Sequence, residues 1–462
     1  MKNRRAILAV QVILGSGLLF AEQGAPPAEL TLAQAIEAAA KNYPAIRVSQ
    51  EQLNAAAAGI RLARTAYLPR VDAYAQMNRA TRNNTFGMLL PQSVLPSISG
   101  PVLGTNSLGS AWGAAVGGLV RWEPFDFGLR HANTAVAEAA RTQSQASLKR
   151  TQFEIATATV DSYLTLAAAQ EAVTAAQAGV QQAESTLRTT KALETAELRP
   201  GADSSRAEAE LAAAGTQLIQ ARQAVEMARA ALSQFVAVDP AHLAIASSRL
   251  LQLPPEEEQP AANLQANPVA LEQGATVEHA RAQLRALEHS YFPKFALEGA
   301  VYARGSGNQL DGTQLGGLNG LAPNIKNYAV GFSVTIPLMD LAAIHAREAA
   351  QSATIRAETA RSEQIVLELR TRWNTALAQL HGARLVAANT PIQVSAARAA
   401  TRQSTARYES GLGTIDQVAE AQRLLSQAEI DDALAHLNVW RALLGLAAAA
   451  GDLQPFLAEA GR

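Results

Sequence analysis

Residues 366–408 read VLELRTRWNTALAQLHGARLVAANTPIQVSAARAATRQSTARY, and this stretch decides the fold. Every seventh residue belongs to one row of seam positions: Val366, Trp373, Leu380, Ala387, Val394, Thr401 and Tyr408. A second row follows three positions later: Leu369, Ala376, Ala383, Thr390, Ala397 and Ser404. Heptads of this length specify long helices that supercoil, and small seam residues let the backbones approach closely. The stretch therefore predicts a long coiled-coil helix.

The same pattern occurs earlier in the chain, so the sequence contains an internal repeat. The earlier heptad row consists of Leu166, Val173, Val180 and Leu187. Leu380 follows Leu166 by 214 positions (380 minus 166). Further upstream, AYLPRVDAYA at 66–75 and SYFPKFALEG at 290–299 match with an offset of 224 (290 minus 66). Self-similarity of this kind has to be recognised before a fold is assigned.

After each of these two matching segments the apolar pattern changes from a helical period to strict alternation. In the second copy the apolar positions are Phe295, Leu297, Gly299 and Val301, and in the first they are Val71, Ala73, Ala75 and Met77. Alternation is typical of a strand with one apolar and one polar face. A second strand follows a loop in each copy and ends just before Asp126 or Asp340. Each copy therefore supplies two amphipathic strands.

These patterns predict the following organisation. We expect a signal peptide at 1–21, a first repeat at 30–248, a linker at 249–262 and a second repeat at 263–455. In the first repeat the strands span about 69–80 and 115–123, the long helix about 127–198 and the return helix about 203–236. In the second repeat the strands span about 293–303 and 328–337, the long helix about 341–410 and the return helix about 416–449.

The composition excludes several classes of function. The chain has 462 residues, a formal net charge of −1 and no cysteine. It has no basic field that favours nucleic acid, and it can form no disulfide, thiol nucleophile or thiolate metal site. It contains no phosphate-binding loop or nucleophile elbow, and its histidines lack metal-ligand spacing. We therefore expect neither an enzyme nor a cofactor or metal site.

The N-terminus resembles a secretory signal. Lys2, Arg4 and Arg5 precede a mostly apolar segment at 6–20, and small residues follow near Ala21. The alternative is a membrane anchor, but roughly 15 apolar residues fall short of the roughly 20 that a spanning helix needs. We expect a cleaved signal and export from the cytoplasm.

Four strands pose a geometric problem. A four-stranded sheet leaves two unpaired edges, which are costly in lipid, and it is too small to close into a barrel around an open interior. Three copies of the chain would pool twelve strands, which suffice. The expected fold is therefore mainly α with a small β part, in which several copies form a hollow, symmetric conduit and the helices continue the barrel as a tube.

At this point the residues resemble a known family. The paired helix-Tyr-x-Pro-strand junctions, the strand-Asp-helix returns and the Gly411-Leu412 turn before TIDQVAEAQRLL at 414–425 are similar to the TolC outer-membrane efflux family. The resemblance implies a homotrimer with a 12-stranded barrel in the lipid of the outer membrane and an α-helical tunnel in the periplasm. It also implies that the tunnel is the exit duct of an inner-membrane pump joined through a periplasmic adaptor.

The resemblance further implies a periplasmic gate of acidic residues. The family pattern is Gly-Leu, a spacer, an acid, two apolar residues, an acid and Ala; here the first acid falls on Gln417 and the second on Glu420, with Asp416 displaced by one. Asp203 matches Gln417 by the offset of 214 and is a further candidate. The alternative is that Asp416 and Asp203 cap their helices and Glu420 faces water.

The helix-to-helix turns resemble the tips on which adaptor proteins dock. Gly411 and Leu412 form one turn and Leu198 lies in the other, where Glu197 replaces the glycine. An exposed leucine would supply an apolar anchor. The alternative is helix termination assisted by glycine.

The main hypothesis is a channel that exports small molecules such as drugs, metals or organic solutes. Within the class, the alternative is the exit duct of a type I protein secretion system. Outside it, the alternative is a periplasmic coiled-coil adaptor, although an adaptor has no reason to carry two pairs of apolar-faced strands.

Overall fold

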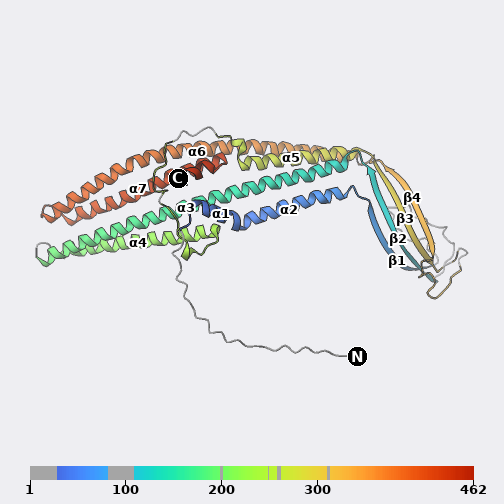
Figure 1. Ribbon diagram of the computed structural model, residues 1–462, viewed down its shortest axis with the longest axis horizontal. Coiled ribbons are helices and arrows are strands. Elements are labelled where there is room, and N and C mark those ends of the chain that lie inside the picture. The colour runs from blue at the N-terminus through green and yellow to red at the C-terminus, as the bar shows by residue number, and fades with distance from the viewer. Residues whose placement is uncertain are drawn as a thin grey trace, which may run out of the picture.

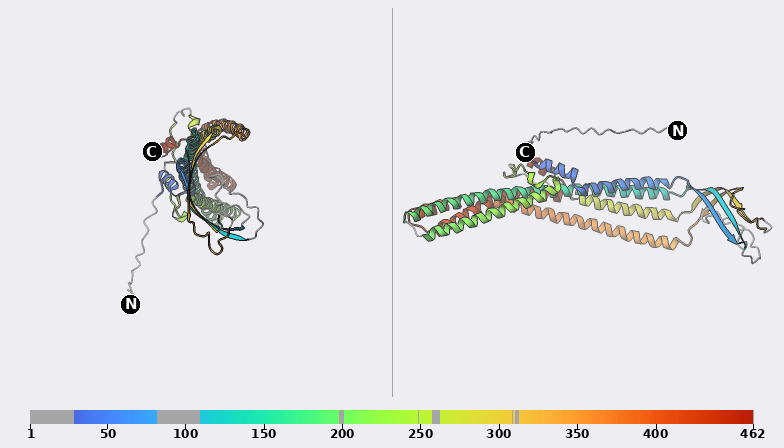
Figure 2. Two further views of the ribbon diagram at one scale, coloured as in Figure 1. Left: turned by 90° about the vertical axis from the view of Figure 1, so that its right-hand side faces the viewer. Right: turned by 90° about the horizontal axis from the view of Figure 1, so that it is seen from below.

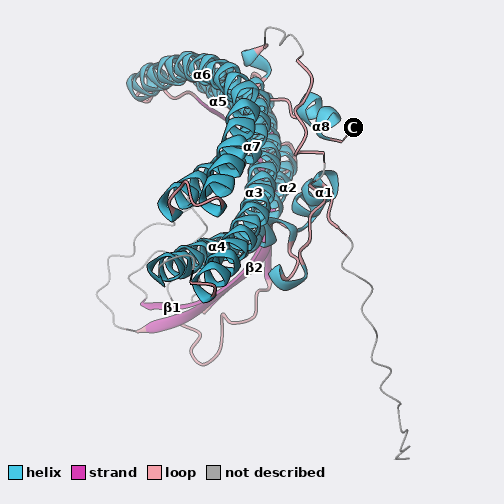
Figure 3. Cartoon of the chain, turned by 90° about the vertical axis from the view of Figure 1, so that its left-hand side faces the viewer, coloured by secondary structure: helices cyan, strands magenta, loops and turns pink. Residues whose placement is uncertain are grey.

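The computed structural model describes residues 29–81, 109–197, 201–247, 249–256, 262–307, 309 and 313–461. These residues form an elongated molecule with a sheet at one end and the turns between helices at the other (Figure 1). Seen along its length, the chain is a curved wall (Figures 2 and 3). The expected signal peptide at 1–21 and the tip residue Leu198 lie outside the described residues.

The same order of elements occurs twice. The first series is α2 (Pro44–Thr65), β1 (Arg70–Thr81), β2 (Ser110–Phe125), α3 (Leu129–Thr195) and α4 (Gly201–Val236). The second is α5 (Pro268–Glu288), β3 (Lys294–Ser306), β4 (Ile325–Thr335), α6 (Leu341–Glu409) and α7 (Ile415–Ala450). Short helices α1 (Leu32–Asn42) and α8 (Gln454–Ala460) flank them. The expectation of a mainly helical chain with a small sheet is confirmed.

The four strands form one antiparallel sheet in the order β1-β2-β3-β4. β2 begins at Ser110, five positions before the expected 115 (115 minus 110), because its Ala- and Gly-rich start pairs with β1 without an apolar alternation that would reveal it. The pairing of β2 with β3 shifts between Trp122 and Phe125, where the strand ends in a bulge. In the described part of the chain, β1 and β4 are the two edges.

The long helices α3 and α6 have 67 and 69 residues, which at 1.5 Å per residue extend about 100 Å. Near the sheet, α3 contacts α2 and α5; towards the tip it contacts α4 and α7. The predicted seam of α6 is buried at nine positions: Leu369, Ala376, Leu380, Ala387, Thr390, Val394, Ala397, Thr401 and Tyr408. The heptad prediction is therefore confirmed, although the helix also continues through Pro391, which lacks the N–H that would bond to Ala387.

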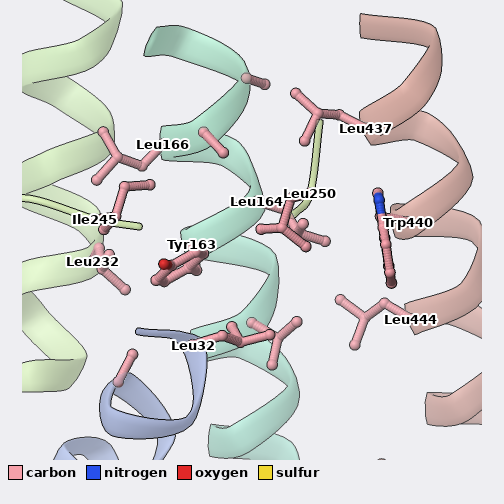
Figure 4. Packing of buried hydrophobic residues seen from close by; sticks show 14 of the residues in the cluster. Leu32, Tyr163, Leu164, Leu166, Leu232, Ile245, Leu250, Leu437, Trp440 and Leu444 are labelled. Carbon is pink, nitrogen blue, oxygen red and sulfur yellow. The ribbon is translucent and has the colours of Figure 1, made fainter. Parts of the chain in front are cut away.

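A compact core lies at the waist, where α1, α3, α4, α7 and α8 meet (Figure 4). Trp440 and Tyr163 are fully buried. The Trp440 indole donates a hydrogen bond to the carbonyl of Gln252 (3.0 Å), and Leu250 is almost fully buried beside it. The first part of the segment expected to be a linker therefore packs into the core; its residues 257–261 lie outside the described residues.

One helix in the described residues, α7, is long and apolar enough to cross a membrane by length and composition alone. Its apolar residues lie in the waist core and against α6, so the core position accounts for this composition.

Tyr163 provides a test of the waist core. Its hydroxyl lies 2.7 Å from the carbonyl oxygen of Ala246 and 2.9 Å from that of Leu30, and burial raises its pKa to about 12. Because the folded state holds this proton more tightly than the unfolded chain, its contribution to stability is complete below pH 10 and is lost as the pH rises towards 12.

We therefore expect Tyr163→Phe to lower stability by about 1 kcal/mol at pH 8, through the lost hydrogen bond, and this deficit to shrink between pH 10 and 12. Thermal unfolding followed by helical circular dichroism at several pH values measures this. A deficit that stays constant up to pH 12 would contradict the assignment.

Candidate functional site: the helical tip and the two-faced sheet

The tip is built by the α3–α4 and α6–α7 hairpins. At the end of α6, Gly411 adopts a left-handed backbone (φ 78°), and its N–H donates to the carbonyl of Tyr408 (3.0 Å). The N–H of Leu412 donates to the carbonyl of Arg407 (2.8 Å). These two bonds form a Schellman motif, which ends a helix by satisfying its last carbonyls. Gly411 therefore terminates the helix, in agreement with the alternative of helix termination assisted by glycine.

Leu412, the next residue, is the apolar projection of this turn. Its side chain is 73% exposed, since the Schellman motif turns it away from both helices of the hairpin. An exposed leucine at a hairpin end is available to a partner. Leu198, the residue expected to do the same in the other hairpin, lies outside the described residues.

Two polar contacts tie the hairpins together at the tip. The hydroxyl of Tyr408, at the end of α6, donates to the carboxylate of Asp203 in α4 (2.9 Å). The guanidinium of Arg206 in α4 pairs with Asp416 at the start of α7 (2.6 Å). Tyr408 is buried, whereas Asp416 is 61% exposed. The hydrogen bond to the buried tyrosine is therefore the stronger tie, because an exposed ion pair contributes at most about 1 kcal/mol.

The capping roles expected of two of these acids are wrong. Helix α4 already begins at Gly201, so Asp203 lies within its first turn. In α7 the N-cap is Thr414, and Asp416 is again in the first turn. Both carboxylates instead face the neighbouring hairpin, while their position near a helix N-terminus still favours the negative charge.

Glu420, the principal gate candidate, lies one turn further along α7. Its carboxylate pairs with Arg423 of the same helix (2.6 Å) and is 72% exposed. The described geometry therefore separates the three acids: Asp203 and Asp416 join hairpins, and Glu420 presents charge at the surface.

Asp126 and Asp340, each of which lies between a strand and a long helix, make different hydrogen bonds. Asp126, two residues before the N-cap Gly128, accepts the backbone N–H of Arg130 (2.7 Å) and pairs with its guanidinium (2.8 Å). Desolvation opposes the charge here, but hydrogen bonds from Arg130 outweigh it and hold the pKa of Asp126 below its usual value. Asp340 is the N-cap residue of α6, but its side chain makes no capping hydrogen bond.

The sheet lies at the opposite end of the molecule from the tip (Figure 1), and its two faces differ in the side chains they carry. One face, here called the apolar face, exposes large apolar side chains, among them Val71, Met77, Val116, Val120, Trp122, Leu297, Val301, Tyr328, Val330, Phe332 and Val334. The opposite, polar face carries Asp72, Gln76, Asn78, Arg121, Glu298 and Ser333. An exposed apolar surface of this extent marks contact with a membrane or another protein.

Sequence reasoning missed Tyr408 and Arg206 as site residues. The heptad pattern identifies Tyr408 only as a seam position. The one signal in the sequence was that a tyrosine, whose hydroxyl needs a polar partner, occupies the last of these positions. Within the described residues, no group of three or more histidine, aspartate or glutamate side chains is arranged to hold a metal.

Comparisons with known proteins agree with this architecture. A family model described as outer membrane efflux protein matches residues 35–238 and 260–452. The fold is similar to the outer-membrane channel OprN, at 21% identity over 91% of this chain and 89% of that one, with a TM-score of 0.71.

It is also similar to the Campylobacter jejuni CmeC outer membrane channel (15% identity, 91% and 85% covered, TM-score 0.73). The open state of the Neisseria gonorrhoeae MtrE outer membrane channel gives 20% identity, 92% and 89% covered, and a TM-score of 0.70. A search of curated proteins gives no match. Identities this low establish a shared fold, whereas the family model matches both halves of the chain. The chain belongs to the outer membrane efflux protein family.

Proposed function

We propose that the chain forms a homotrimeric channel in the outer membrane, with its helices extending into the periplasm. The channel serves as the exit duct of an efflux system that exports small molecules such as drugs, metals or organic solutes. An inner-membrane pump supplies the energy and a periplasmic adaptor joins the two. The duct itself catalyses no reaction.

The observation that carries this proposal is a two-faced sheet joined to helices about 100 Å long. The apolar face suits lipid, and the polar face suits a water-filled interior. Four strands with two open edges are unstable in lipid, because each unsatisfied backbone group costs several kcal/mol. Three copies would supply twelve strands and a curved helical wall would continue the bore.

The sheet also separates this function from that of a periplasmic adaptor. An adaptor works in water, where an apolar face with large exposed side chains such as Tyr328 and Val330 would promote aggregation. In a membrane, the same side chains would contact lipid and be removed from water.

Substitutions on the two faces test the membrane assignment. We expect Val330→Arg, on the apolar face of β4, to destabilise the barrel by about 2–4 kcal/mol, because it places a charge in lipid. Asn327→Arg, on the polar face of the same strand, is the matched control and should have little effect. The measurement is the yield of heat-sensitive trimer in outer-membrane fractions.

Recovery of the unaltered protein as a soluble monomer would refute the channel. Equal yields from the two arginine variants would refute the assignment of the faces.

We assign the periplasmic gate to the tip, with separate roles for the three acids. Asp203 and Asp416 close it mechanically, because their contacts with Tyr408 and Arg206 hold the two hairpins together. Glu420 contributes charge: three copies near the axis would attract cations and repel anions. The pairing of Glu420 with Arg423 reduces this field without abolishing it.

Planar-bilayer recordings test these roles. We expect Tyr408→Phe with Asp416→Ala to raise single-channel conductance, because the two ties together contribute about 2–4 kcal/mol to the closed tip. Glu420→Ala should instead lower cation selectivity. Glu208→Ala removes an acid that pairs with Lys191 within a single hairpin (2.6 Å), so it is the control for both.

If Glu208→Ala raises conductance as much as the tie variants, the specific role of the ties is wrong. Unchanged selectivity in Glu420→Ala removes Glu420 from the gate.

We further propose that the adaptor docks at the α6–α7 turn, where Gly411 shapes the turn and Leu412 provides the anchor. Leu198 is assigned the same role in the other hairpin on the strength of the sequence alone. A single exposed apolar side chain at the centre of a contact can supply much of its binding energy.

A photo-crosslinking amino acid at position 412 should form an adduct with the adaptor in intact cells. The same group at Ile219, which is similarly exposed (67%) but lies along the side of α4, is the control. An adduct from position 219 alone would place the adaptor on the helical wall instead of the tip.

A further inference from the structure

The two halves of the sheet obey one pairing rule. Adding 224 to a β1 residue and 214 to a β2 residue converts the observed pair Arg70↔Arg121 into Lys294↔Thr335. That pair is itself observed between β3 and β4. The offsets that relate the two halves in sequence therefore also preserve hydrogen-bond register without a slip.

The same rule can be carried one step further, to the two open edges. Within the chain, β2 pairs with β3 and so joins the first half to the second. In the repeat, β4 corresponds to β2 and β1 corresponds to β3. The contact equivalent to the β2–β3 pairing would therefore join β4 to β1. Since β1 and β4 lie at opposite edges of one sheet, only a β1 strand from a second copy can make this contact.

We propose that β4 pairs antiparallel with β1 of the partner subunit in the register dictated by the β2–β3 ladder. The observed pair Leu119↔Ala300 then becomes Ser333 opposite Gln76 of the partner subunit. The adjacent pair Val120↔Gly299 becomes Val334 opposite Ala75 of the partner subunit. This inference rests on the proposed trimer and specifies how its subunits meet.

The faces of the strands agree with this register. Val334 and Ala75 both belong to the apolar side of their strands, and Ser333 and Gln76 both belong to the polar side. A slip of one residue would place each polar side chain on the apolar face of the barrel.

A glycine supports the same contact. A side chain at Gly117 would collide with the Cβ of Tyr302 on the neighbouring strand, so glycine is required there. Its equivalent, Gly331, is also glycine, although no described atom lies within 4 Å of where its Cβ would be. The proposed register brings Asn78 of the partner subunit opposite Gly331, which explains the missing side chain.

The membrane-proximal junction supports it independently. Between the halves, Phe125 and Phe127 pack on Phe292 and Phe295, with ring centroids 5.1 to 6.2 Å apart. The equivalents of these four residues are Met339, Leu341, Leu68 and Val71, which are all apolar and exposed by 93%, 39%, 66% and 67%. The partner subunit would bury them in the same kind of cluster, at roughly 25 cal/mol per Å² of apolar surface.

Cysteine cross-linking tests the register, and the chain has no cysteine of its own. The variants are Gln76→Cys/Ser333→Cys and Ala75→Cys/Val334→Cys. Neighbouring pairs alternate between hydrogen-bonded and non-hydrogen-bonded geometry, with Cα atoms about 5.5 and 4.5 Å apart, and disulfides form across both distances. Within one subunit the two edges are separated by three strand spacings, roughly 14 Å, so no disulfide forms inside a chain.

We expect oxidation in outer-membrane fractions to shift the boiled protein from monomer to covalent trimer, reversibly on reduction. The controls Tyr74→Cys/Ser333→Cys and Asn78→Cys/Ser333→Cys keep the same face and shift the register by two residues. They should give less cross-linked trimer than the matched variants. Unboiled samples show whether each variant assembles.

The outcomes distinguish the two proposals. Stronger cross-linking from a shifted pair, or none from any pair in a protein that assembles as a trimer, overturns the register but leaves the trimer standing. A protein that is monomeric before boiling and never cross-links overturns the trimer and the register together.

Discussion

The structure depends on the hydrogen-bonding needs of two strand edges. In water, the N–H and C=O groups of β1 and β4 would be solvated, whereas in lipid they require partners. Their apolar faces favour lipid, so the environment that suits the side chains is the one that leaves the edges unsatisfied. Association with identical chains, as in the proposed trimer, would resolve this conflict, because each copy offers both edges. Within one chain, the helices form a curved wall that extends away from the sheet (Figure 3).

Much of this architecture could be predicted from sequence, because it depends on periodicity. The heptad row from Val366 to Tyr408 gave the long helix and its buried seam, and the alternation from Phe295 to Val301 gave a strand. The two repeat offsets identify equivalent residues in the two halves from sequence alone. The start of β2 was missed because its alanines and glycines pair without an apolar pattern.

The contacts at the tip could not be predicted in the same way. Asp203 and Asp416 stand where acids usually cap helices, and local sequence therefore favoured that role. Their actual partners, Tyr408 and Arg206, are more than 200 positions away, and the contact depends on how two hairpins lie side by side. Likewise, Leu250 looked like part of a linker, because a short segment has no periodicity to reveal that it enters a core.

The way in which this chain distributes its apolar residues has a consequence for its delivery. A polypeptide bound for the outer membrane must first be threaded through the inner one, where translocons retain long continuous apolar helices. The strands contain no such run, because polar or small residues occupy most of their alternate positions, with Leu119 as an apolar exception. Helix α7 is long and apolar enough to be retained, yet His436, Asn438 and Arg441 interrupt it. In the proposed outer-membrane channel, the continuous apolar face would therefore form only after export, when the strands pair into a sheet.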